Sequence, residues 1–387
     1  MKKRIGIFLN RDLKMNAGGP SGYLYNLKLG LDEFDNNIEF FTKETSRNNT
    51  DANVQKKKKY SAIYSDLRLA LSYILKGKKI KNKIDPKMYN MDCIHVHASE
   101  DLWALKAIIG YKGKIVFTPH RPETLANEVI TTQQLLNDTN YSFPILRQVC
   151  DFIETYSYKN ADAFIFPSKG AAKIYEKFPG FIRYAINKPM QFVYTGTRDV
   201  NVTANINDYD ELRKDGKLTF AYVGRHNYIK GYDLLINAFQ QIDVNKVKVV
   251  CAGAQSNIEA PKSKNWVELG YIKNANSLMK AVDCVVIPNR NTYFDLVIIE
   301  ALAVGAIVIT SSTGGNVDLA EDTDGLILFE SGNVESLDKA ISTFLELSDD
   351  EKTRMKENNR KLYESRCAIG CFARAYSVAV NKLVELI

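Results

Sequence analysis

The 387-residue sequence has no apolar run long enough to cross a membrane, and its cysteines form no closely spaced pair. A membrane-spanning helix needs about 20 mostly apolar residues. The first apolar stretch, Ile5–Leu9, is far shorter, and it is also too short for a signal peptide. The six cysteines contain no Cys-x-x-Cys motif, and most lie within apolar runs, as reduced core thiols do. We therefore expect a cytoplasmic protein whose first strand is buried.

The usual signatures of metal and phosphate sites are also missing. The glycine-rich segment 16–22 matches neither the Gly-x-Gly-x-x-Gly fingerprint nor a P-loop. His95 and His97 lie on one predicted strand, where we expect their side chains to face opposite ways and not to share a metal ion. The acidic segment 322–324 is followed by Gly325 and is interpreted as a polar turn. We expect neither a metal site nor a cofactor.

Positive charge is concentrated in the first third of the chain. Residues 1–120 contain 22 Lys and Arg against 12 Asp and Glu. In the region 56–83, two lysine-rich runs flank a segment whose apolar residues have helical spacing. Such a helix can lie on the inner, anionic face of a membrane, or it can be an ordinary surface helix with solvated lysines. No nucleic-acid-binding module is found, so we expect no nucleic-acid partner.

Short apolar runs alternate with helical patterns, which is typical of parallel sheets buried on both faces. Eight runs fall into two sets of four: 5–9, 93–96, 114–117 and 163–166, then 218–223, 247–252, 284–287 and 306–310. The predicted fold class is therefore α/β, with two Rossmann-like doubly wound parallel-sheet domains facing a cleft. We expect these domains at 1–195 and 196–370, with a C-terminal helix at 371–387 packing across a domain surface.

Ligands of such sheets bind beyond the carboxyl ends of the strands, so the loops there are candidate sites. Arg225 and Lys230 flank the turn after one predicted strand; a guanidinium and an ammonium group together could hold a diphosphate. Glu300 lies in an apolar, helix-like stretch, where an ionised carboxylate is costly unless it is paired or contacts ligand hydroxyls. Gly314 and Gly315 could offer backbone amides to a phosphate or a sugar.

A second glycine pair, Gly18 and Gly19, follows the first predicted strand and precedes a helical pattern. Glycines at this place let the backbone approach a ligand closely, and the amides at a helix start favour an anion. A plain glycine-rich turn explains the segment equally well.

Taken together, these segments resemble the retaining, nucleotide-sugar-dependent glycosyltransferases of family four, which have the GT-B fold. The resemblance covers nearly the whole chain and rests on the order and spacing of segments 18–19, 166–168, 223–225 with 230–231, 294–305, and 314–315 with Asp318. It implies that Arg225 and Lys230 hold the donor diphosphate during catalysis and that Glu300 binds the nucleotide ribose. It also places His120 near the anomeric carbon of the donor sugar; the alternative is a loop histidine that stabilises the turn between two prolines.

Two residues depart from the family pattern. Thr292 stands where the family usually has the first of two glutamates, which contacts the donor sugar, and Asp295 replaces a usual glycine. We therefore assign both to the donor site but leave the donor open. The resemblance implies a metal-independent hexosyltransferase that uses a nucleotide-diphosphate sugar and a glycan, lipid-linked or protein acceptor, in bacterial polysaccharide synthesis. A non-catalytic GT-B subunit that binds a partner or a glycan remains the alternative, followed by a sugar-nucleotide epimerase.

Overall fold

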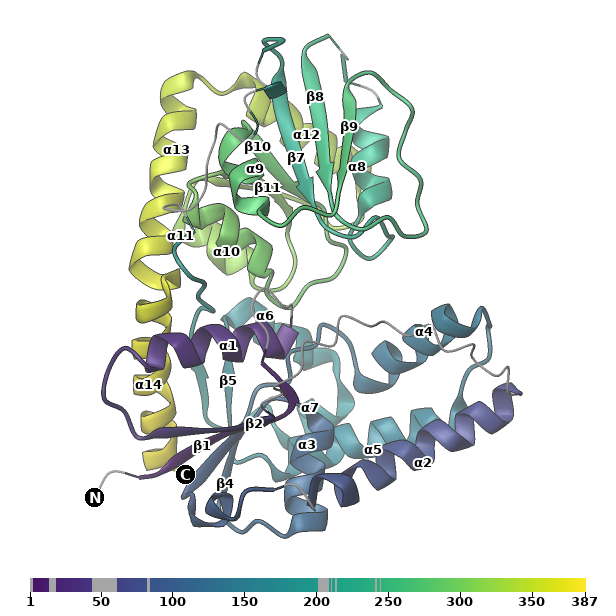
Figure 1. Cartoon of the computed structure of the whole chain (residues 1–387), viewed down its shortest axis with the longest axis vertical. Coiled ribbons are helices and arrows are strands. Elements are labelled where there is room, and N and C mark those ends of the chain that lie inside the picture. The colour runs from purple at the N-terminus through teal and green to yellow at the C-terminus, as the bar shows by residue number, and fades with distance from the viewer. Residues whose placement is uncertain are drawn as a thin grey trace. The chain divides into compact units, whose positions relative to one another are not determined.

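The computed structural model describes residues 3–13, 19–43, 61–81, 84–200, 209, 211–212, 214–240, 242–243 and 245–387. They form two compact units, each built on one six-stranded parallel sheet (Figure 1). The first unit contains the chain up to Phe166, together with Lys173–Val193 and Arg374–Ile387; the second contains Pro167–Ala172 and Tyr194–Ala373. The predicted fold class, with two doubly wound parallel sheets, is confirmed.

The sheet of the first unit has the order β2-β1-β3-β4-β5-β6. The strands are β1 (Ile5–Asp12), β2 (Ile38–Lys43), β3 (Cys93–Val96), β4 (Lys114–Phe117), β5 (Ala163–Phe166) and β6 (Met190–Phe192). β1 pairs in register with both neighbours, so that Ile5 lies beside Ile38 and Cys93. All four residues of β3 and of β5 are buried, which explains their continuous apolar sequences.

Helices connect the strands of the first unit. They are α1 (Gly19–Leu31), α2 (Ala62–Lys81), η1 (Pro86–Asn90), α3 (Ser99–Trp103), η2 (Ala104–Ile109), α4 (Leu125–Asn137), α5 (Pro144–Asn160), α6 (Lys169–Lys173), η3 (Ile174–Lys177), α7 (Pro179–Tyr184) and the greater part of α14 (Ile369–Leu386). α14 is locked into this unit by buried Tyr376, whose hydroxyl lies 2.7 Å from His95 Nδ1, and by Asn381, which accepts a hydrogen bond from Asn37 at 2.9 Å.

The sheet of the second unit has the order β12-β11-β10-β7-β8-β9. Its elements are β7 (Leu218–Val223), α8 (Tyr232–Phe239), β8 (Val247–Ala252), β9 (Trp266–Gly270), α9 (Ala275–Ala281), β10 (Cys284–Ile287), α10 (Leu296–Ala303), β11 (Ile307–Ser311), α11 (Asn316–Asp322), β12 (Leu326–Phe329), α12 (Val334–Glu346), α13 (Asp349–Leu362) and η5 (Tyr363–Cys367). The strand order reverses between β7 and β10, which makes their carboxyl ends the expected ligand site of this unit.

Both faces of the second sheet are covered by apolar cores. Phe220 and Tyr222 of β7 belong to one core, whereas Ala221, between them, belongs to the other. This follows from the alternation of side chains along a strand. In the part of the chain that the structure describes, no helix is long and apolar enough to cross a membrane.

Candidate active site

The turn between β7 and α8 places Arg225 and Lys230 at the carboxyl edge of the second sheet. Gly231 ends the turn with φ of 64°, and a Cβ atom there would lie 1.8 Å from the carbonyl oxygen of Pro288, so only glycine fits. The hydroxyl of Tyr222 donates to the carbonyl of Arg225 at 2.7 Å. Contacts to the backbone thus fix the turn, while the side chain of Arg225 remains exposed.

Lys230 faces the start of α10, the helix that follows β10. Its Nζ lies 3.7 Å from Oδ1 of Asp295, and Asn289 donates to Oδ2 of the same carboxylate at 2.7 Å. Asp295 is 8% exposed and occupies the N-cap position of α10. The loops after β7 and β10 are therefore joined by a cation and a carboxylate at the point where the strand order reverses.

Glu300 lies in the second turn of α10 and is partly accessible. Burial of its carboxyl group raises its pKa to about 7. Among the described residues, none donates a hydrogen bond to it or forms an ion pair with it. A carboxyl group in this state can accept hydrogen bonds from ligand hydroxyls without first losing a protein partner.

The glycine pair after β11 packs against the segment that contains Thr292. Gly314 has φ of 56°, and a Cβ atom there would lie 2.2 Å from the carbonyl oxygen of Thr292, which is itself buried. The amide of Gly315 donates to the carbonyl of Tyr293 at 3.1 Å. The amide of Gly315 therefore already donates a hydrogen bond within the protein. Both positions need glycine because neighbouring atoms leave no room for a Cβ atom.

Gly170 was not singled out by the sequence. A Cβ atom on it would lie 2.4 Å from the carbonyl oxygen of Gly314, and its amide donates to Asp318 Oδ2 at 2.8 Å. These contacts within the second unit join the start of α6, just after the segment 166–168, to the segment 314–318.

A buried polar group next to Arg225 was also missed. His226 is fully buried, its ring stacks on Tyr232 with centroids 4.1 Å apart, and its Nε2 lies 3.5 Å from Glu268 Oε2. Trp266 donates to the other oxygen of Glu268 at 2.7 Å. Burial lowers the pKa of His226 and so favours its neutral form. These buried contacts hold the residue next to Arg225 in place within the turn between β7 and α8.

His120 belongs to the first unit, where it follows β4. It adopts a left-handed conformation with φ of 45°, which is uncommon for a residue other than glycine. Its Nε2 lies 2.9 Å from His97 Nδ1, and the ring of Tyr23 meets it edge-on with centroids 4.9 Å apart. Burial, helped by the charge of Arg121, lowers the pKa of His120 to about 3.

The expectation that His95 and His97 face opposite ways was wrong. Their ring centroids are 4.1 Å apart, because side chains two residues apart in a strand share a face. His95 Nε2 lies 2.8 Å from the hydroxyl of Thr118. Within the described ranges, no group of three or more His, Cys, Asp or Glu side chains is arranged to hold a metal ion. Of the first glycine pair, Gly19 begins α1 with φ of 65°, whereas Gly18 lies outside the described residues.

The first unit also contains a buried acid with several cations around it. Glu100 is 2% exposed and lies 3.1 Å from Arg121, 3.1 Å from Lys76 and 3.4 Å from Arg11. Burial alone would raise the pKa of this carboxyl group, but the three cations hold it well below its usual range. Arg121 in addition contacts Glu128 at 2.6 Å. The charge of Glu100 is therefore fully compensated within the protein.

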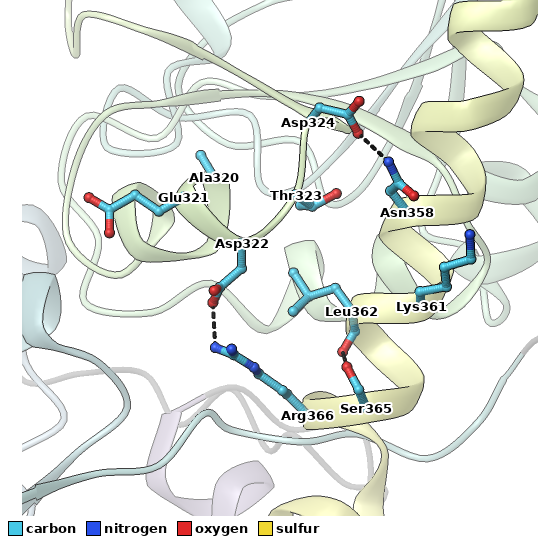
Figure 2. A pocket seen from close by; sticks show the side chains of 10 residues that line it. All are labelled: Ala320, Glu321, Asp322, Thr323, Asp324, Asn358, Lys361, Leu362, Ser365 and Arg366. Atoms are coloured by element: carbon cyan, nitrogen blue, oxygen red, sulfur yellow. Dashed lines mark hydrogen bonds and ion pairs between the residues drawn. The ribbon is translucent and has the colours of Figure 1, made fainter.

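A pocket of about 640 Å³ lies in the second unit, but it contains none of the predicted site residues (Figure 2). Ten residues line it: Ala320, Glu321, Asp322, Thr323, Asp324, Asn358, Lys361, Leu362, Ser365 and Arg366. Asp322 accepts from Arg366 at 2.7 Å, and Asp324 accepts from Asn358 at 2.9 Å (Figure 2). These acids are already bonded to neighbouring side chains, so we do not assign a ligand to this pocket.

Comparison with known proteins is in accord with the geometry of both units. Residues 17–188 match the family model described as Glycosyltransferase Family 4, and residues 205–362 match that of Glycosyl transferases group 1. Together the two models span most of the chain. The chain is a family-four glycosyltransferase with the GT-B fold. This confirms the family inferred from the sequence motifs.

One relative is similar to this chain in sequence, and two solved structures are similar to it in fold. An uncharacterized 41.2 kDa protein in the cps region of Klebsiella pneumoniae is 26% identical over 64% of this chain and 68% of its own length. Sucrose-phosphate synthase from Thermosynechococcus elongatus has a similar fold, with a TM-score of 0.70 at 17% identity over the full length of both chains. HepE of Anabaena, solved in complex with UDP, gives a TM-score of 0.64 at 17% identity and covers 98% of this chain and all of its own.

Proposed function

We propose that this glycosyltransferase moves a sugar from a nucleotide-diphosphate sugar to a glycan, lipid-linked or protein acceptor, with retention of anomeric configuration and without a metal ion. The arrangement of Arg225, Lys230 and Glu300 carries the proposal. All three lie on elements that follow β7 and β10, where the strand order of the second sheet reverses. The two cations suit a diphosphate, and the carboxyl group of Glu300, which has no partner in the described ranges, suits the ribose hydroxyls.

The chemistry follows from where negative charge develops. As the bond between the anomeric carbon and the phosphate oxygen breaks, charge accumulates on the departing diphosphate. Arg225 and Lys230 stabilise this charge more strongly in the transition state than in the ground state. The acceptor oxygen then bonds to the anomeric carbon on the same face, and its proton passes to the departing phosphate oxygen, so no separate protein base is required.

His120 is proposed to contact the donor sugar as a neutral group. Its pKa of about 3 keeps the imidazole uncharged at pH 7, so it can donate one hydrogen bond and accept another. The complex of HepE with UDP supports a uridine nucleotide as the first donor to test.

The test is a thermal-shift and product screen across nucleotide sugars, because a ligand that binds only the native state raises its stability. We expect Arg225→Ala or Lys230→Ala to lower kcat/KM at least tenfold, or about 1.4 kcal/mol. Lys246→Ala serves as the matched control, since this exposed lysine precedes β8 at the opposite edge of the sheet.

Each outcome of this screen is informative. Unchanged turnover in both variants would contradict the roles of Arg225 and Lys230. A nucleotide sugar that stabilises the protein but is neither transferred nor hydrolysed with any acceptor would favour the non-catalytic GT-B subunit. The feature behind that alternative is Thr292, which is buried where the family usually has a glutamate.

A further inference from the structure

Helix α2 is firmly attached to the first unit by one of its faces. Asp66 on this face is fully buried and accepts hydrogen bonds from the amides of Ile145 and Leu146, at 3.1 and 2.7 Å. These amides belong to the first turn of α5, which runs beside α2 (Figure 1). Ala70 and Gly77 are buried on the same side. The orientation of α2 about its axis is therefore fixed.

The opposite face of α2 presents large apolar side chains to solvent. They are Ile63, Tyr64, Leu67, Leu71, Ile74 and Leu75, each between 42% and 67% exposed, and we call them the α2 stripe. At about 100° per residue they fall within an arc of about 120° and extend over about 18 Å of the helix. Single exposed apolar residues are common, but a continuous row of this length marks an interaction surface.

Charge distinguishes between the partners that could cover the stripe. The sequence of α2 contains five Lys or Arg, of which Lys76 pairs with buried Glu100, and a single acid. That acid is Asp66, which is buried on the far side, so the α2 stripe carries no carboxylate. A cationic helix with an apolar face complements an anionic lipid surface. A second copy of the chain would instead bring two cationic helices together, at a cost in repulsion.

We propose that the α2 stripe docks on an anionic lipid bilayer, with its apolar side chains inserted at the boundary between headgroups and acyl chains. This goes beyond the proposed transfer reaction and stands without it. Where both hold, docking would bring the first unit to lipid-linked acceptors. The proposal uses only residues 61–81; the lysine run 56–59 and residues 82–83, which the sequence also suggested, lie outside the described residues.

The test measures co-sedimentation of the full chain with lipid vesicles. We expect binding to phosphatidylcholine vesicles that contain about one third phosphatidylglycerol, weaker binding to pure phosphatidylcholine, and a loss of binding with added salt. Leu67→Gln with Leu71→Gln should lower the partition coefficient at least tenfold. Both side chains are 47% exposed, so the thermal midpoint should hardly change.

The matched control is Leu135→Gln with Leu136→Gln on α4, a leucine pair of the same unit that is 70% and 55% exposed; because it is even more accessible than the α2 pair and lies outside the stripe, the change should leave vesicle binding intact. Undiminished binding by the α2 double variant, or equal binding to neutral vesicles, would overturn the proposal. A wild-type dimer in light scattering that the α2 substitutions dissociate would assign the stripe to a second copy instead. A chain that binds vesicles but no nucleotide sugar would contradict the proposed function and leave this inference standing.

Discussion

Two largely buried glutamates, one in each unit, have opposite surroundings. Glu100 of the first unit is surrounded by Arg121, Lys76 and Arg11, and its pKa is held well below the usual range. Glu300 of the second unit has no such partner among the described residues, and burial raises its pKa to about 7. A glutamate side chain is therefore ionised and paired with cations in the first unit, whereas in the second unit it is buried without a described cation beside it.

The difference separates charge that serves the fold from charge available to a ligand. An acid whose cations are supplied by the chain has nothing left to offer a ligand. An acid that the chain buries without a partner destabilises the native state whenever it ionises, and a ligand with hydroxyl groups can supply the missing hydrogen bonds. This criterion favours Glu300 over Glu100 as a site residue, although Glu100 is the more buried of the two.

The largest expected effect is on the structural acid. Glu100→Gln removes the buried carboxylate that pairs with the largely buried Arg121 and with the more exposed Lys76 and Arg11, and it should lower the free energy of unfolding by about 3 to 5 kcal/mol, measured by urea denaturation at pH 7. Glu128→Gln is the matched control: it removes the other carboxylate on Arg121, but Glu128 is 55% exposed and the loss should stay below about 1 kcal/mol. Similar losses in the two variants would contradict the role of Glu100 as the buried acid on which the fold depends.

Glu300→Gln should act in the opposite direction. The folded pKa of about 7 lies above the ordinary value of 4.5, so native protein loses stability as pH rises between these two values. The variant escapes this loss and should be more stable than wild type by about 3 kcal/mol at pH 8 and about equally stable near pH 4. Nucleotide-sugar affinity should fall at the same time. If wild type and Glu300→Gln differed in stability by the same amount at pH 8 and at pH 4, the charge of Glu300 would have to be balanced within the protein.

The smallest expected effect concerns the histidines. Burial lowers the pKa of all four, His95, His97, His120 and His226, below the ordinary 6.5. Proton NMR between pH 6.5 and 8 should therefore show no histidine midpoint, and a change in activity across that range should be reduced in Glu300→Gln, because the pKa of Glu300 is about 7. Because the unfolded chain takes up protons on its histidines first, the histidine contribution to native stability should shrink as pH falls below 6.5, and Glu300→Gln, which lacks the opposing contribution of Glu300, is the protein in which to measure it. A histidine whose NMR titration midpoint lies above pH 6.5 would contradict the expected lowering of its pKa.

Central strands were predictable from the sequence, whereas most edge strands were not. All eight predicted runs are strands, because parallel strands buried on both faces need continuous apolar residues. The missed strands β2, β6 and β9 are edges of the two sheets. Every residue of β9 is only partly buried, and β6 has three residues, so neither leaves a continuous apolar pattern.

The candidate site divides in the same way. Arg225, Lys230 and Glu300 could be singled out because their residue types are unusual beside strand ends and in an apolar helix. The stacked pair of His226 with Tyr232 and the contact of Gly170 with Asp318 could not, since each joins residues through the tertiary fold and leaves no local pattern. The shared face of His95 and His97 could have been predicted, because side chains two residues apart in a strand point to the same side, but the prediction was wrong.

The position of Tyr376 has a consequence for synthesis on the ribosome. Domains commonly fold as they emerge, beginning with the one made first. Here the first unit includes Arg374–Ile387, and His95 in its central strand finds the hydroxyl of Tyr376 only after the entire second unit has been translated. The unit whose translation begins first should therefore be the later of the two to complete its native packing.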